Sequence, residues 1–372
     1  MMAQPMQVLN QREKTVLELR SIYTSYGYRP FKMNQFEAYD LYAENKSFLL
    51  SENVITFTDA SGQLMALKPD VTLSIVKSAR DGRTEKVCYD ENVYRTDPAS
   101  HEFREIMQAG LECIGDVDAY CSGEVVLLAL KSLQTICPDF ILDLSHMGYL
   151  SGLFDDAALT AVQREQMMKC LCSKSKGGVS QLCAQFGVDA QRQQILCQLA
   201  EMYEPVESAL AQLEAMSLNS QMTEAVDQLK ELYAFLQLFG YAPYVRIDFS
   251  AGSDMQYYSG IVFRGFVSGC ADCVLSGGRY DGLVRKLKRH GGAIGFAVYL
   301  DRIERISRQS REHDVDVLIV YDTDTPLSVL AQQVKTITQQ SKSVSVQRVG
   351  NEDGTTYVQR LDLTQKGADR DA

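Results

Sequence analysis

The chain has 372 residues, of which 45% are hydrophobic and 23% charged, the composition of an ordinary globular protein. No apolar run approaches the roughly 20 residues that cross a bilayer, and the N-terminal stretch lacks the basic and apolar regions of a secretory signal, so we expect a cytoplasmic protein. With 37 basic against 48 acidic residues the net charge is −11, which disfavours nucleic-acid binding without excluding a local basic patch.

Ten cysteines in a chain of this length are too dilute for a disulfide scaffold, so we expect reduced thiols. One CxxC motif occurs, Cys270-Ala-Asp-Cys273, without a second pair or a histidine at ligand spacing. A closed zinc site needs about four ligands. We therefore predict no metal site and no cofactor, and we interpret the motif as a turn between strands.

The N-terminal elements alternate between helix and strand. A helix is expected over 10–26, where apolar residues recur at helical spacing. Runs 54–58 and 63–67 flank the turn residues Asp59-Ala60-Ser61-Gly62, which predicts a hairpin, and a helix follows over 71–80. The next expected elements are strands 85–95 and 106–114, a helix over 124–134 and a strand over 139–144.

From about residue 155 to 239 the pattern becomes helical and rich in Gln, Leu, Ala and Met. We predict a helical insertion, 155–240, whose methionines fill its core. The elements expected after it are strands 244–249, 257–267 and 271–276, a short helix 283–288, a strand and helix over 295–307, a strand 315–321, a helix 326–341, a strand 343–348 and a polar, frayed tail 362–372.

This order predicts an α+β fold with a largely antiparallel sheet in a main domain, 1–312, and a short α/β segment over 313–372. Asp70 and Thr72 stand between a strand and a helix. A carboxylate and a hydroxyl at such a junction suit the capture of an ammonium group. A helix N-cap by Asp70 is the alternative, and it stays open.

Gln108 and Glu112 are four residues apart on a predicted strand, so both side chains face the same side. A carboxylate and an amide together can hold an imidazole. Arg95 stands at the base of the preceding loop, where it can meet a carboxylate or a phosphate. The alternative is a solvated strand face with surface salt bridges.

Five segments, taken in order, resemble the catalytic core of the class II histidyl-tRNA synthetases: KPDVT, VYR followed by FREIMQAGLECIG, YYSGIVF, GGRYDGL and GFAVYLDR. The resemblance covers roughly residues 10–310. Five ordered matches at compatible spacing are far more specific than any single one. The resemblance implies a class II aminoacyl-tRNA synthetase-like antiparallel sheet with flanking helices.

The departures from that family point away from catalysis. Ser253 stands where the synthetases carry their catalytic arginine, and loss of such a cation costs roughly 3–4 kcal/mol of transition-state stabilisation. Tyr299 replaces a small residue, usually Gly, that lets the nucleotide approach the backbone. The motif 2 loop is one residue short and carries acidic and small residues in place of cations. Roughly 60 residues follow Asp314, against about one hundred in an anticodon-binding domain.

This set of departures resembles the regulatory subunits of ATP phosphoribosyltransferase, a histidyl-tRNA-synthetase-like family that does not aminoacylate tRNA. The resemblance implies no catalytic residue and a histidine-binding pocket. Asp70 and Thr72 would hold the α-amino group, Gln108 and Arg95 the polar end of the amino acid, and Glu112 and Tyr258 the imidazole. Tyr257 completes the set, whereas Arg279, Tyr280 and Arg302 are weaker candidates that brace the fold.

The resemblance also implies partners: a short-form ATP phosphoribosyltransferase catalytic subunit and L-histidine as a feedback ligand, in a homodimer within a larger hetero-oligomer, without tRNA and without a membrane. The alternatives are a histidyl-tRNA synthetase, active or degenerate, and a stand-alone histidine-binding paralogue. The sequence leaves open the stoichiometry, the docking face, the role of the C-terminal segment, and whether histidine binds in the inherited pocket or at an interface.

Overall fold

The computed structural model describes residues 9–45, 54–80, 82–97, 100–252, 257–307, 313–340, 342–351 and 353–364. The chain divides into two compact units, Arg12–Ile303 and a second unit made of Met1–Gln11 and Glu304–Ala372. Within the described ranges, no helix is long and apolar enough to cross a membrane.

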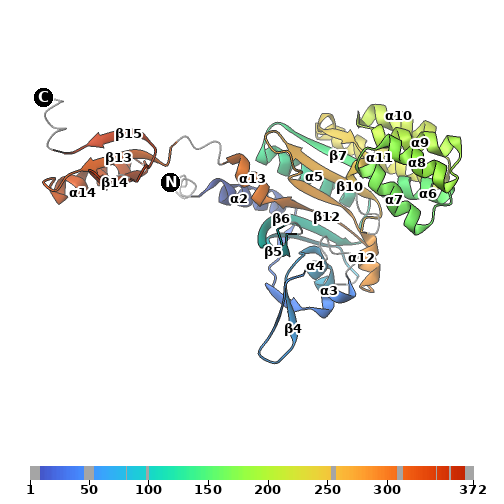
Figure 1. The fold of residues 1–372 in the computed structure, drawn as a ribbon, viewed down its shortest axis with the longest axis horizontal. Coiled ribbons are helices and arrows are strands. Elements are labelled where there is room, and N and C mark those ends of the chain that lie inside the picture. The colour runs from blue at the N-terminus through green and yellow to red at the C-terminus, as the bar shows by residue number, and fades with distance from the viewer. Residues whose placement is uncertain are drawn as a thin grey trace. The chain divides into compact units, whose positions relative to one another are not determined.

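A nine-stranded sheet forms the centre of the larger unit (Figure 1), in the order β1-β5-β6-β12-β11-β10-β7-β9-β8. The pairs β1–β5 and β7–β9 are parallel, and the other neighbouring strands are antiparallel. The predicted α+β class with a largely antiparallel sheet is therefore confirmed. The strands are β1 Arg29–Pro30, β5 Glu85–Thr96, β6 Phe103–Gly115, β7 Phe140–His146, β8 Glu204–Pro205, β9 Val245–Ile247, β10 Ile261–Val267, β11 Leu275–Arg279 and β12 Gly292–Tyr299.

Helices cover both faces of this sheet (Figure 1). On one face lies α5, Ala119–Ile136, which is longer than predicted because the Asp118 carboxylate caps it by accepting a hydrogen bond from the Cys121 amide at 2.8 Å. The helix α2, Gln11–Ser25, packs beside α5, and Tyr23 contacts Ser132 there at 2.9 Å. On the other face lie two short helices, α4, Thr72–Ser78, and α12, Asp281–Lys286.

Six helices follow β7 and pack at one end of the sheet (Figure 1). Met167 and Met222 are fully buried among them, as expected for methionines that fill a core. The sequence pattern did not predict α6. The helices are α6 Met147–Asp156, α7 Ala161–Cys172, α8 Lys176–Phe186, α9 Ala190–Glu201, α10 Val206–Met216 and α11 Ser220–Leu238.

The predicted hairpin is present as β3, Thr56–Thr58, and β4, Leu64–Leu67, which pair antiparallel. The Asp59 carboxylate closes its turn by accepting hydrogen bonds from the amides of Ser61 and Gln63, both at 2.8 Å. Gly62 has a φ of 85°, a conformation that glycine adopts without a steric cost. The strand β2, Phe36–Ala38, adds to this small sheet, and α3, Asp40–Glu44, follows it; neither was predicted.

Several predicted boundaries after the insertion were wrong. Residues 244–249 form only the short strand β9, and a 3₁₀ turn follows at Phe249–Ala251. The strand expected from residue 257 begins only at Ile261, and Gly260 before it accepts a hydrogen bond from the Met147 amide. The next strand, expected over 271–276, is β11, Leu275–Arg279, and the helix expected over 283–288 is α12.

The described part of the smaller unit contains a three-stranded parallel sheet in the order β14-β13-β15. Val317, Ile319, Leu330 and Ile337 form the core between this sheet and α14. The strand β15 was not predicted. The helix α13, Leu300–Ser307, follows β12, and the other elements are β13 Val315–Tyr321, α14 Leu327–Gln339, β14 Val344–Arg348 and β15 Tyr357–Asp362.

Candidate functional site

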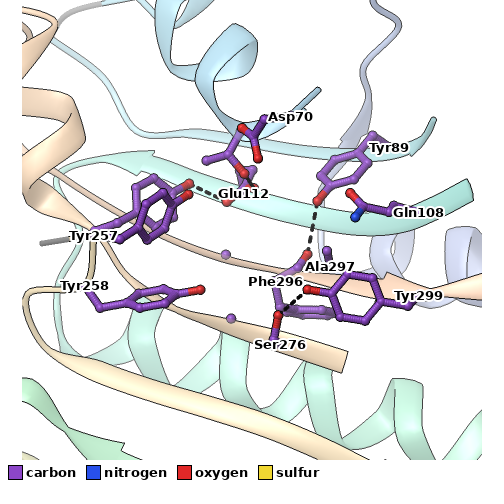
Figure 2. Close-up of a pocket in the computed structure, with 14 residues that line it drawn as sticks. Asp70, Tyr89, Gln108, Glu112, Tyr257, Tyr258, Ser276, Phe296, Ala297 and Tyr299 are labelled. Atoms are coloured by element: carbon purple, nitrogen blue, oxygen red, sulfur yellow. Dashed lines mark hydrogen bonds between the residues drawn. The ribbon is translucent and has the colours of Figure 1, made fainter. Parts of the chain in front are cut away.

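A cavity opens on the face of the nine-stranded sheet that carries α4 (Figure 2). It contains about 390 Å³ of empty space, a volume that includes open solvent at its mouth. Six of the seven candidate residues line this cavity; Arg95 does not. The six are Asp70, Thr72, Gln108, Glu112, Tyr257 and Tyr258.

Asp70 lies between β4 and α4, and it is buried. One carboxylate oxygen accepts a hydrogen bond from the Leu73 amide at 2.9 Å, which stabilises the first turn of α4. Burial raises the pKa of the Asp70 carboxyl, although the Leu73 amide and the charge of Arg95 oppose the shift. The N-cap of α4 is Val71, so the N-cap position predicted for Asp70 was wrong by one residue, although its carboxylate still bonds the first turn of α4 and lines the cavity.

Glu112 lies at the centre of the cavity and accepts two hydrogen bonds. Thr72 Oγ1 donates to Glu112 Oε1 at 2.7 Å, and the Tyr280 hydroxyl donates to Glu112 Oε2. Burial raises the pKa of Glu112 to about 8, although both donors oppose the shift. The neighbouring carboxyl of Asp70 is a smaller cause of the same upward shift. A cationic ligand would favour the ionised form of both acids.

The backbone of β12 leaves room for this carboxyl only because residue 295 is a glycine. Glu112 on β6 pairs with Gly295 on β12. A Cβ at residue 295 would lie 1.6 Å from Glu112 Oε2 and 2.4 Å from the Leu111 carbonyl oxygen. The pairing therefore requires glycine at this close approach.

Aromatic rings form the wall beside Glu112 (Figure 2). Tyr257 and Tyr258 pack edge to face with their centroids 4.7 Å apart, and Tyr257 lies 5.5 Å from Tyr280. The Tyr258 ring rests on the backbone of β11, where a Cβ at Gly278 would lie 2.7 Å from the ring. Two acids, an amide and phenols around a small cavity suit a ligand that carries an ammonium group and ring N–H donors.

The three arginines considered from the sequence lie outside the cavity lining. Arg95 Nε donates to the Pro69 carbonyl at 3.0 Å, and its buried Nη2 has no hydrogen-bond partner in the described structure. Arg279 pairs with Asp281 at 2.9 Å. Arg302 lies over the Tyr299 ring, 4.5 Å from its centroid, and also donates to the backbone of the CxxC turn between β10 and β11.

Tyr299 lines the end of the cavity beside Gln108, with which it pairs across β12 and β6 (Figure 2). Its hydroxyl lies 2.6 Å from Ser276 Oγ. The phenol is thus held in place, as expected for a residue that fills space. Ser253 lies outside the described residues, as does Ala99 of the motif 2 loop.

Sequence reasoning missed two residues at this site. Tyr280 was interpreted as a brace, yet it donates directly to Glu112. Tyr89 lines the cavity from β5 and donates to the Phe296 carbonyl at 3.4 Å. The only signal for Tyr89 was Gly110, its cross-strand partner, where a Cβ would lie 2.6 Å from the Tyr89 hydroxyl.

Comparison with known proteins gives a consistent family. The family model described as histidyl-tRNA synthetase matches residues 3–303. An ATP phosphoribosyltransferase regulatory subunit from Caldanaerobacter subterraneus subsp. tengcongensis is 31% identical over 303 residues, 79% of this chain and 78% of the relative. Further curated relatives of the same name are 24–28% identical.

Solved structures share the fold. An ATP phosphoribosyltransferase regulatory subunit/histidyl-tRNA synthetase from Bacillus halodurans C superposes with a TM-score of 0.76 at 22% identity, covering 95% of this chain and 94% of that one. A chain of the ATP phosphoribosyl transferase (HisG:HisZ) complex from Thermotoga maritima gives 0.60 at 19% identity, covering 78% and 97%. This chain therefore belongs to the histidyl-tRNA synthetase family, among the regulatory subunits of ATP phosphoribosyltransferase.

Proposed function

We propose that this chain is a non-catalytic regulatory subunit that binds L-histidine in the cavity around Glu112. It assembles with a short-form ATP phosphoribosyltransferase catalytic subunit, is required for the activity of that subunit, and transmits histidine feedback to the first step of histidine biosynthesis. It acts as a homodimer within a larger hetero-oligomer and does not charge tRNA.

The observation that carries this proposal is a contrast between the two ends of the cavity. Around Glu112, two buried acids and three tyrosines complement the ammonium and imidazole groups of histidine. At the other end, the Tyr299 phenol is bonded to Ser276 at 2.6 Å, where the synthetase family keeps a small residue for its nucleotide. The site therefore suits the binding of histidine but not the binding of ATP, the nucleotide that would activate histidine.

The names of the relatives support the partner. Several curated relatives are called regulatory subunits of ATP phosphoribosyltransferase, and one fold neighbour belongs to a solved complex of that enzyme. Feedback then needs a coupling free energy between the two proteins. Histidine must bind one state of the assembly more tightly than the other, and typical couplings are about 1–3 kcal/mol.

The test combines histidine binding with activity of the complex. Calorimetry should detect histidine binding by wild type, and adding the chain to the short-form catalytic subunit should raise activity that histidine then inhibits. Replacing Asp70 by Asn should weaken histidine binding and feedback while leaving activation intact. Asp272→Asn, at an exposed turn, is the matched control and should behave as wild type.

Two outcomes would contradict the proposal. Histidine-dependent ATP–pyrophosphate exchange by the purified chain would identify an active synthetase. Histidine binding without any effect on, or association with, the catalytic subunit would favour a stand-alone histidine-binding protein.

A further inference from the structure

Six cations gather at the C-terminal ends of α4 and α12, and we call them the basic patch. The two helices pack in one hydrophobic core through Val76 and Val284. Arg289 Nη2 donates to the Lys77 carbonyl at 2.8 Å, which joins the end of α4 to the turn after α12. The patch stands on a chain of net charge −11 and consists of Lys77, Arg80, Arg285, Lys286, Lys288 and Arg289.

Four of the six cations in the basic patch differ in their pairing from several other cations of the larger unit. Lys169, Lys176 and Lys230, for example, each lie 2.8 Å from a carboxylate of the same chain. In the patch, Lys77 and Arg285 are exposed and form no ion pair within the described part of the chain. The same holds for Arg80 and Lys288. These charges are therefore available to a carboxylate from outside the chain.

Helix dipoles do not account for the whole patch. Cations in the last turn of a helix are favourable, which covers Lys77 on α4 and Arg285 and Lys286 on α12. Lys288 and Arg289 lie beyond the end of α12, where this effect falls off. Four cations within five residues, 285–289, exceed what capping of a six-residue helix needs.

We infer that the basic patch docks an acidic surface of the ATP phosphoribosyltransferase catalytic subunit, an inference that rests on the proposed function. A nucleic acid is the less favoured polyanion, because its phosphates would extend beyond the patch and meet the acidic remainder of this chain.

The position of the patch links docking to the cavity. Thr72, the first residue of α4, and Tyr280, the residue before α12, both donate to Glu112. The opposite ends of these helices carry Lys77 and Arg285. Helices of this length span only about 10 Å. The same two helices thus run from the histidine cavity to the docking surface, so a ligand that shifts their starts also shifts the patch.

The test compares two variants with equal changes in charge. The patch variant K77Q/R285Q/K288Q and the control K169Q/K176Q/K230Q each lose three positive charges. Titration calorimetry with the short-form catalytic subunit from the same organism measures the affinity at 50 and 300 mM salt. Far-ultraviolet circular dichroism and histidine affinity, which should stay within about twofold of wild type, check that each variant is folded.

We expect the patch variant to bind the catalytic subunit about tenfold more weakly than wild type at low salt, with a flatter salt dependence, and the control to bind as wild type. Equal binding by the patch variant and wild type would overturn the inference and leave the proposed function intact. The inference would also be overturned if the patch variant lost tRNA binding or self-association, measured in parallel, but still bound the catalytic subunit as wild type does. Absence of any binding by wild type would instead reject the proposed function.

Discussion

Replacing Glu112 by Gln should stabilise the ligand-free chain increasingly as the pH rises. Burial raises the pKa of Glu112 from 4.5 to about 8, so the folded chain favours the protonated carboxyl. The stability from this group is complete below pH 4.5 and is lost as the pH rises through 8. The rise in pKa from 4.5 to about 8 lowers the free energy of unfolding by about 5 kcal/mol once Glu112 is fully ionised, because one pKa unit corresponds to about 1.4 kcal/mol. Gln cannot ionise, so the variant escapes this loss.

Urea unfolding without histidine, followed by far-ultraviolet circular dichroism, measures the effect. Between pH 5.5 and 8.5 the unfolding free energy of Glu112→Gln relative to wild type should rise by about 3 kcal/mol. Glu165→Gln makes the same chemical change on an exposed face of α7, where the hydrogen bond from Lys169 lowers the pKa of the acid, and should show no such rise above pH 5.5. If the difference in unfolding free energy between Glu112→Gln and wild type did not change with pH, the raised pKa of Glu112 could not be its cause.

Three further changes test other parts of the structure. Gly295→Ala should destabilise the chain by several kcal/mol and abolish histidine binding, because a Cβ would lie 1.6 Å from Glu112 Oε2; unchanged thermal unfolding would contradict this packing. Asp118→Ala should lower the unfolding free energy by about 1 kcal/mol through loss of the α5 cap to Cys121, with Asp118→Asn restoring most of it. Ser253→Arg alone should not create ATP–pyrophosphate exchange, because the Tyr299 phenol, held by Ser276, would still obstruct a nucleotide; robust exchange would show that the arginine was the sole missing group.

The parts of the site that depend on strand periodicity could be predicted from the sequence. Gln108 and Glu112 are four residues apart on β6, and both line the cavity because alternate strand residues face one side. Asp70 and Thr72 follow from a strand-to-helix junction that is local in the sequence. That these residues bind histidine stays a prediction.

The parts that depend on distant pairing could not be predicted. Tyr89 reaches the cavity only because Gly110 stands opposite it on β6. Tyr280 bonds to Glu112 across 168 residues of sequence. The strand β15 pairs in parallel with β13, and its mostly exposed sequence, Tyr-Val-Gln-Arg-Leu-Asp, does not alternate between apolar and polar residues. For Tyr280 and β15 the deciding contact lies far along the chain, whereas for Tyr89 it depends on which residue faces it on the next strand.

The pairing of β6 with β12 beside Glu112 has a consequence for the synthesis of the protein. β6 pairs with β12, and the whole of α5 to α11 lies between these two strands in the sequence. Pairings of such long sequence separation form late, after the intervening chain has been made. A nascent polypeptide therefore leaves Glu112 open to water until Gly295 emerges from the ribosome, and the cavity can close around this carboxyl only after both segments have been translated.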